Sequence, residues 1–303
     1  MAEMVACLHG GKVEVVRHGQ APQRLESPYR ERLAQAREQQ AVPRIVSVTR
    51  GRRPAELCYA ITSRDASGVF AQVPGSGNEQ QLFHSADAHL SDLDFSLADE
   101  ALTCTIAGAD GTSAIGLLAD DGKGLRTVTE GDVIDRAPRW APGGRAEIVY
   151  ASAGIGRSKA GKAVGRSPFA LHRLRFIDNS VEVLMADAQY DYEAVVPVSE
   201  HLLYALRRNY DGQLRRSARS GISGIFRGIL AIRASRTLRG HELVRLTPQG
   251  AQVVARDVLA FDVAANEDVV YSSELGVFRI TLGQTTAEPL ADLKRVEQLV
   301  IYG

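Results

Sequence analysis

Short runs in which apolar and polar residues alternate recur along nearly the whole chain, separated by turns rich in Gly, Asp, Asn and Pro. Examples are EIVYAS, FALHRLRF and VEVLMAD. An alternation with a period of two is typical of strands with one buried face, and the turn residues predict antiparallel neighbours. We therefore expect an all-β protein.

The predicted strands form a repeat. A large apolar residue before a turn is followed about ten positions later by a small or aromatic residue, at Val48/Cys58, Phe95/Cys104, Trp140/Tyr150, Val196/Tyr204 and Phe261/Tyr271. The first members are 47, 45, 56 and 65 residues apart. These spacings equal or exceed the roughly 40 to 45 residues of a four-stranded propeller blade. The repeat predicts a propeller in which two blades carry insertions.

The two ends of the chain complete the count of blades. The segment Leu293–Gly303 resembles an inner strand with nothing after it, and Met4–Ser27 resembles three strands with nothing before them. Together they would form one blade shared by the termini, which closes the ring without a free sheet edge. We therefore expect a single domain over residues 1–303 with six blades.

Three segments interrupt the strand pattern. Ser27–Gln40 has Ser27 as a candidate N-cap, Pro28 at the first helical position and Pro43 beyond its end, which predicts a short helix. Ala153–Pro168 and Arg207–Gly240 are insertions between second and third strands. In a propeller these connections emerge on the same face as the connections between blades, so we expect all three segments on one side of the disc.

The two insertions are strongly basic. Ala153–Pro168 contains four cations and no acid, and Arg207–Gly240 contains nine arginines against Asp211. Because the formal net charge of the chain is zero, their +4 and +8 leave −12 for the remainder. The charge count predicts a strongly dipolar molecule with a basic inserted face. The cations of the first insertion are Arg157, Lys159, Lys162 and Arg166.

The segment DRAPRWAPGGRAEIVYAS (Asp135–Ser152) resembles the TolB-like (WD-repeat-like) propeller repeat, whose usual form is Asp, Pro, an aromatic residue, Ser-Pro-Asp-Gly and a strand. The matching residues are Asp135, Pro138, Trp140, Pro142 and Gly144. Here Ala-Pro-Gly-Gly replaces the usual turn, and glycine can supply its positive φ. The resemblance implies a six-bladed propeller similar to bacterial cytoplasmic TolB-like proteins of unassigned role, and it implies no activity.

A second candidate feature is an amphipathic helix at Gly221–Arg233. Its isoleucines and phenylalanine fall on one side of a helical wheel, although Arg233 lies within that stripe. Such a helix could dock on an acidic protein or an anionic membrane surface, or it could pack as a lid on the propeller itself. The candidate partner-binding residues are Arg157, Lys159, Lys162, Arg166, Arg215, Arg216, Arg219, Ile222, Phe226, Arg227 and Arg233.

Other chemistry has less support in the sequence. The seven histidines are scattered without ligand spacing, no Gly-x-Ser-x-Gly elbow is present, and no catalytic residue or cofactor is predicted. A divalent metal in the central channel, held by acids such as Asp92, Asp135, Asp191 and Asp262, would make the protein a lactonase-like hydrolase. The basic loop Ala153–Pro168 lacks the spacing of a phosphate-binding P-loop, and nucleic acid is less favoured because few aromatic residues accompany the arginines.

Cys7, Cys58 and Cys104 lie in apolar strands and are expected to be buried free thiols. Neither a signal peptide nor an apolar run of membrane-spanning length is encoded, so we expect a cytoplasmic location. Taken together, the sequence favours a non-catalytic interaction scaffold whose basic face binds an acidic protein. The alternatives are the metal-dependent hydrolase and a module bound peripherally to a membrane.

Overall fold

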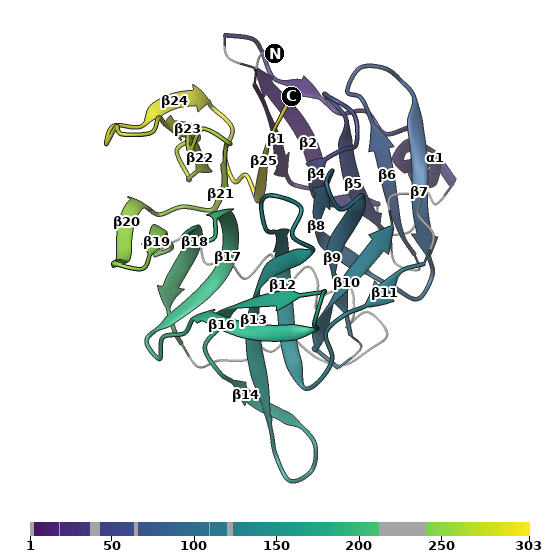
Figure 1. Ribbon diagram of the computed structural model, residues 1–303. Coiled ribbons are helices and arrows are strands. Elements are labelled where there is room, and N and C mark those ends of the chain that lie inside the picture. The colour runs from purple at the N-terminus through teal and green to yellow at the C-terminus, as the bar shows by residue number, and fades with distance from the viewer. Residues whose placement is uncertain are drawn as a thin grey trace.

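The structure is a computed structural model, and it describes residues 3–17, 19–36, 43–63, 66–108, 110–119, 124–211 and 240–303. Strand pairing gives four separate four-stranded sheets and one nine-stranded sheet. The nine-stranded sheet contains two successive blades, which a single parallel bridge between Ser113 and Ile134 joins. The sheets are arranged around a central axis (Figure 1). The all-β propeller predicted from the repeat is confirmed.

Each blade of the described chain is an antiparallel meander, with its first strand nearest the axis. The first two blades are β25 (Gln298–Tyr302), β1 (Met4–His9), β2 (Lys12–Arg17) and β3 (Gln23–Arg24), then β4 (Arg44–Arg50), β5 (Leu57–Thr62), β6 (Ser67–Gln72) and β7 (Glu79–Ser85). The next two are β8 (Leu90–Ser96), β9 (Ala101–Ala107), β10 (Ser113–Ala119) and β11 (Arg126–Thr127), then β12 (Val133–Trp140), β13 (Glu147–Arg157), β15 (Ala170–Arg175) and β16 (Ser180–Met185), with β14 (Ala163–Arg166) paired to β13. The last two are β17 (Tyr190–Ser199), β18 (Leu202–Asn209), β19 (Glu242–Thr247) and β20 (Gly250–Arg256), then β21 (Ala260–Val263), β22 (Val269–Ser272), β23 (Val277–Ile280) and β24 (Glu288–Ala291).

The termini share a blade, as the sequence predicts. Strands β1 and β25 pair antiparallel from Met4 opposite Tyr302 to Leu8 opposite Gln298. The Glu297 amide extends the ladder by donating to the Leu8 carbonyl at 2.7 Å. This ladder closes the ring through backbone hydrogen bonds.

The hydrophobic core lies between adjacent blades. The middle strands β5 and β6 are buried at every position, because a neighbouring blade covers each of their faces. The outermost strands are more exposed, and Val181 and Val183 of β16 reach solvent. Cys7, Cys58 and Cys104 are buried free thiols in the second strand of their blades, and burial raises the pKa of Cys58 to about 12.

The predicted helix is α1 (Pro28–Ala36). Ser27 caps it, because its Oγ accepts the amide of Arg30 at 3.2 Å and donates to Glu79 at 2.5 Å. Glu79 of β7 also accepts the Tyr29 amide at 2.8 Å, which fixes the start of the helix against its own propeller. No helix within the described ranges is long and apolar enough to cross a membrane.

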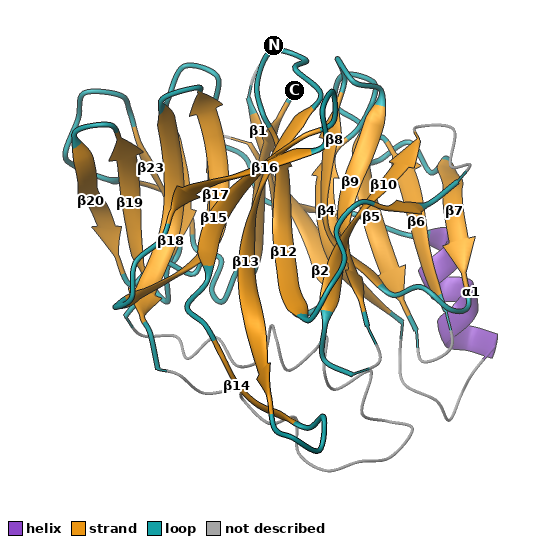
Figure 2. Cartoon of the chain, turned by 60° about the horizontal axis from the view of Figure 1, so that its bottom comes forward, coloured by secondary structure: helices purple, strands orange, loops and turns teal. Residues whose placement is uncertain are grey.

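The two faces of the disc differ in their connections. We call the insert face the side with the connections from second to third strand and between blades, and the turn face the side with the other two hairpin turns of each blade. The β13–β14 hairpin extends from the insert face, at the bottom of Figure 2, and helix α1 lies at the outer edge of the disc beside β7. Both chain ends lie at the turn face, at the top of the same view.

The motif Asp135–Ser152 forms the β12–β13 hairpin, in which Trp140 pairs with Ile148. Its turn contains Gly143 and Gly144 with φ of 91° and 63°, the conformation that the substituted turn requires. At Gly144 a Cβ would lie 2.8 Å from the Cβ of Ala98 in the neighbouring blade. The position thus needs glycine for its backbone conformation and for its close contact.

Candidate partner-binding surface

The first basic insertion is a β-hairpin. Strand β13 continues past its own blade, so that residues Glu147 to Ser152 pair with β15 while Ile155 to Arg157 pair with β14. The hairpin extends beyond the body of the disc in two views (Figures 1 and 2). The sequence pattern placed this insertion outside the strand repeat, whereas in the structure Ala163–Arg166 forms a strand paired with β13.

The tip of the hairpin carries two of the predicted partner-binding residues. The Ser158 amide donates to the Lys162 carbonyl and the Gly161 amide to the Ser158 carbonyl, each at 2.8 Å, and Gly161 has a φ of 75°. Lys159 and Lys162 are exposed on this turn, and Val164 on β14 is 65% exposed. The tip therefore presents two cations beside one apolar side chain.

Arg157 lies at the base of this tip and binds two carboxylates. It donates from Nη2 to Asp110 and from Nε to Asp132, both at 2.7 Å. Asp110 follows β9 and Asp132 precedes β12, so the two loops belong to the insert face. The bonds from Arg157 lower the pKa of Asp132. Arg157 thus fastens the hairpin to the neighbouring blade.

Arg166, at the other end of the hairpin, is buried in a bidentate ion pair. Its Nη1 and Nη2 donate to the two oxygens of Asp191 at 2.6 and 2.7 Å. Asp191 is fully buried and also accepts the Phe169 amide at 2.9 Å. The guanidinium lies over the rings of Phe169 and Tyr210, and the Tyr210 hydroxyl donates to the Arg166 carbonyl. Such a pair has high geometric specificity.

A second buried carboxylate, Glu193, adjoins this pair. Arg136 and His241 lie 3.4 Å from its oxygens, and Arg208 bridges it to Asp191. Burial alone would raise the pKa of Glu193, but Arg136, His241 and Arg208 hold it well below the usual range. We call this group the root cluster, with the members Arg136, Arg166, Asp191, Glu193, Arg208 and His241.

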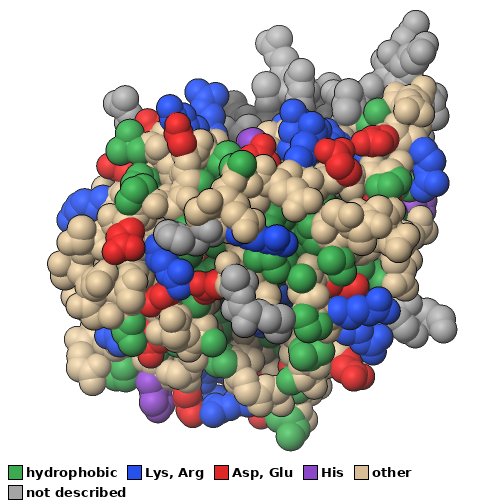
Figure 3. All heavy atoms as spheres, turned by 90° about the horizontal axis from the view of Figure 1, so that it is seen from above, with side chains coloured by type: hydrophobic (Ala, Val, Ile, Leu, Met, Phe, Trp, Pro, Cys, Tyr) green, Lys and Arg blue, Asp and Glu red, His purple; other side chains and the backbone are tan. Residues whose placement is uncertain are grey.

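These contacts show that several cations counted as part of a basic face are bound to acids. Arg207 donates to Glu242 at 3.0 Å, so the described arginines of both insertions, 157, 166, 207 and 208, all bind carboxylates. The predicted boundary of the second insertion also moves, because Arg207 and Arg208 belong to β18, which ends at Asn209. On the face that Figure 3 shows, acidic and basic side chains are interspersed. Four of the cations that were counted toward the predicted dipole are therefore paired locally with acids.

The remaining candidates lie outside the described residues. They include the predicted helix Gly221–Arg233 and the side chains of Arg215, Arg216, Arg219, Ile222, Phe226, Arg227 and Arg233. Their role in binding stays a prediction.

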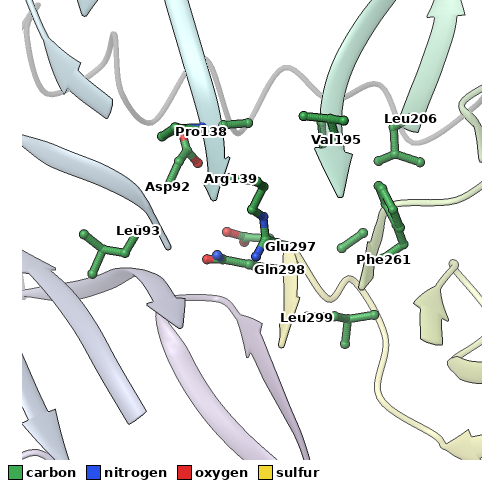
Figure 4. A pocket seen from close by; sticks show the side chains of 13 residues that line it. Asp92, Leu93, Pro138, Arg139, Val195, Leu206, Phe261, Glu297, Gln298 and Leu299 are labelled. Carbon is green, nitrogen blue, oxygen red and sulfur yellow. The ribbon is translucent and has the colours of Figure 1, made fainter. Parts of the chain in front are cut away.

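The central channel narrows to a cavity of about 60 Å³, with room for a few water molecules. Arg139 of β12 reaches into it beside Glu297 and Gln298 (Figure 4). Its guanidinium lies 3.2 Å from Asp94 of β8 and 4.0 Å from Asp262 of β21. Arg139 therefore links three blades across the axis.

Gln298 makes a further link across the axis. Its side-chain amide donates to the Val48 carbonyl at 2.8 Å and accepts the Val48 amide at 3.1 Å, as a neighbouring strand would. This side chain joins the shared blade to β4. The Arg139 and Gln298 side chains in the channel therefore hold neighbouring blades together.

The four acids proposed as metal ligands do not gather at one place, although Asp92 and Asp262 both lie near Arg139. Asp191 belongs to the root cluster, and Asp262 accepts the Ile301 amide at 2.8 Å. Asp92 lines the channel, and burial raises the pKa of Asp135 on β12. In the part of the chain that the structure describes, no group of three or more His, Cys, Asp or Glu residues could hold a metal ion. The metal-dependent hydrolase remains a prediction that no geometry among the described residues supports.

The sequence reasoning missed Glu193, His241 and Arg136. Glu193 stands in YDYEAVV, where a second acid interrupts an apolar inner strand, and this is a signal for a buried ionic group. His241 follows the second insertion and is only 2% exposed. A buried carboxylate next to a basic segment indicates an internal partner for the arginines.

Comparison with known proteins identifies the fold. No protein-family model matches the sequence, and no curated protein matches it. Solved structures do match. A chain of a nidogen/laminin complex aligns over 99% of this chain and 98% of its own, with a TM-score of 0.67 and 9% identity. TolB from Acinetobacter baumannii aligns over 99% and 66%, with a TM-score of 0.62 and 11% identity.

A protein described as TolB from Agrobacterium tumefaciens aligns over 100% of this chain and 97% of its own, with a TM-score of 0.56 and 12% identity. The class defined by strand order and these neighbours is the β-propeller. More particularly, the chain has a TolB-like β-propeller fold, as the motif Asp135–Ser152 predicted. At these identities the likeness concerns the fold.

Proposed function

We propose that this protein is a non-catalytic interaction scaffold and that its insert face binds an acidic surface on a protein partner. The observation that carries the proposal is the β13–β14 hairpin, which projects from a closed disc and exposes Lys159, Lys162 and Val164 at its end. A projecting hairpin with two cations and an apolar side chain suits contact with a partner.

The hairpin is prepared for binding because it is fastened at both ends. Arg157 binds Asp110 of the neighbouring blade and Asp132 of the connection before β12, and Arg166 is held in the root cluster. A recognition element that is already ordered loses less conformational entropy when it binds. The two lysines would contribute mainly association rate and specificity, because exposed charges steer encounter more than they add affinity.

The propeller fold is compatible with this role. The nidogen/laminin structure is by its title a complex of proteins, and a chain of it aligns with nearly all of the present chain. Residues of the second insertion, among them Arg215, Arg219, Ile222 and Phe226, would extend the same surface. We include them on the basis of sequence, together with the expected cytoplasmic location.

Charge reversal tests the proposal. Lys159→Glu with Lys162→Glu changes the tip, and Arg24→Glu with Arg126→Glu makes the same change in net charge on the outer strands β3 and β11, where both arginines are exposed. Partners would be captured from the native cytoplasm at increasing salt, identified, purified and titrated against each protein. We expect the tip variant to bind at least tenfold more weakly and the control variant to bind as the wild type.

Further experiments test whether the second insertion contributes to binding and whether the surface binds lipid or nucleic acid instead of protein. Removing residues 212–239 should weaken the same partner further if the second insertion contributes. Co-sedimentation with phosphatidylserine vesicles and a shift of a labelled oligonucleotide test anionic lipid and nucleic acid. Equal partner binding by the tip and control variants, or strong salt-sensitive binding to vesicles or oligonucleotide alone, would overturn the proposal.

A further inference from the structure

A second cavity, of about 140 Å³, lies between the β4–β7 blade and the next blade. Its floor is apolar and consists of Cys58, Ala71, Phe95 and Leu102, each at most 5% exposed. Leu82 and Gln80 of the outer strand β7 form a wall. Arg52 and Arg53, both exposed, line it where the β4–β5 turn leaves the turn face.

The void follows from two small side chains placed opposite each other. Cys58 of β5 and Ala71 of β6 are direct cross-strand partners, so they stand on the same side of their sheet. Phe95 and Leu102 of the next blade face them and leave the space between unfilled. Protein interiors are close-packed, and a void of this size beside the surface is therefore informative. An engineered cavity of about 150 Å³ accommodates benzene.

The turn above this floor is held by hydrogen bonds and contains Arg52 and Arg53. Glu56 accepts the amides of Arg52 and Arg53 at 2.9 and 3.2 Å, and its own carbonyl accepts the Gly51 amide at 2.7 Å. Arg50 donates to the carbonyl of Phe95, which forms part of the floor, at 3.3 Å. Arg52 and Arg53 thus line the opening together with Glu56.

We propose that the cavity binds the carboxyl terminus of a polypeptide whose last residue is leucine or of similar size. The apolar side chain occupies the floor formed by Cys58, Ala71 and Leu102, and the terminal carboxylate binds Arg52 and Arg53. Guanidinium groups bind carboxylates with paired, directional hydrogen bonds. Capture of a chain end is a known mode of peptide recognition.

The site would select a ligand in which a carboxylate group lies next to one compact apolar group. A free branched-chain carboxylic acid shares that chemistry, but the Gln80 side chain on the wall offers an additional partner for a peptide bond. The cavity is at the turn face and the β13–β14 hairpin at the insert face, so this inference is independent of the proposed function.

The test uses methyl NMR on the full chain with labelled Ala, Leu, Ile and Val methyl groups. The probes are acetyl-Gly-Gly-Leu with a free carboxylate, the same peptide with a C-terminal amide, and 4-methylpentanoate. We expect the free peptide to shift the methyl signals of Ala71, Leu82 and Leu102 with a saturable dose dependence. The amide should bind at least tenfold more weakly, and 4-methylpentanoate should also bind more weakly than the peptide acid.

Variants locate the two halves of the site. Arg52→Glu with Arg53→Glu should remove the preference for the free carboxylate, whereas Arg24→Glu with Arg126→Glu should leave binding unchanged. Ala71→Leu should fill the floor and abolish the shifts, with thermal unfolding as the check on its fold. Absence of shifts, equal affinity for acid and amide, or unchanged binding by the double arginine variant overturns the proposal. Equal affinity for 4-methylpentanoate and the peptide overturns the assignment to a chain end.

Discussion

Basic residues at the two ends of the β13–β14 hairpin lie in opposite surroundings. At its root, Arg166 is buried against Asp191 and stacked between aromatic rings. At its tip, Lys159 and Lys162 are exposed on the turn between β13 and β14. All these cations come from one short basic segment, and only the tip offers its charge to a partner. Basic residues in a sequence therefore indicate an interaction surface only after their internal partners are known.

The largest expected difference between root and tip is in stability. Asp191→Ala would leave Arg166 without its bidentate partner in a buried site, and breaking one side of a buried pair costs roughly 3–5 kcal/mol. Urea-induced unfolding should show that loss in the free energy of unfolding. Lys162→Ala at the tip should change it by less than about 0.5 kcal/mol. A loss of less than about 1 kcal/mol for Asp191→Ala would mean that the root pair does not hold the hairpin.

The root cluster should also make the fold sensitive to acid. Although burial opposes its ionisation, Glu193 has a pKa well below the usual range because Arg136, His241 and Arg208 stabilise the carboxylate. A lowered pKa in the folded state gives stability that is present above the unfolded-state value, about 4.3, and is lost as pH falls through the folded value.

Below about pH 4.3 the wild type should thus lose stability with decreasing pH. Glu193→Gln, which cannot ionise, should be less stable at pH 7 and should lose less on acidification, as measured by thermal unfolding across this range. An identical slope for variant and wild type would show that Glu193 does not supply this pH dependence.

The smallest effect concerns order at the tip. Arg157→Gln removes the ion pairs to Asp110 and Asp132 at the surface, so global unfolding should stay unchanged. Hydrogen exchange at the amides of Ser158 and Gly161 should accelerate, because the hairpin loses its attachment to the neighbouring blade. Arg126→Gln on β11 serves as the control. Unchanged exchange in Arg157→Gln would indicate that β-pairing alone orders the tip.

Much of the fold could be predicted because its determinants are local. Two of the five repeat pairs, Val196 with Tyr204 and Phe261 with Tyr271, are direct cross-strand partners. Equivalent positions of each blade are buried against its neighbours, so the apolar pattern of the sequence repeats once per blade. The joining of the two ends, the helix after Ser27 and the positive φ at the substituted turn followed from the same reasoning.

The site was predicted less completely, because ion pairs depend on which blades become neighbours. Arg166 meets Asp191 only after β14 has folded back beside the next blade, and neither residue's local sequence indicates the other. Residue counting therefore assigned Arg157 and Arg166 to the surface along with the lysines. The arginine-lined cavity near Cys58 also depends on contacts between blades, and no sequence motif predicts it.

The antiparallel ladder between β1 and β25 has a mechanical consequence. Because Met4 lies opposite Tyr302, both ends of the polypeptide leave the sheet at the same end of that ladder. Tension applied between the ends would load its hydrogen bonds one after another, as in opening a zipper, and would not shear them together. A ring held together by packing between blades would thus open at low force when pulled by its termini.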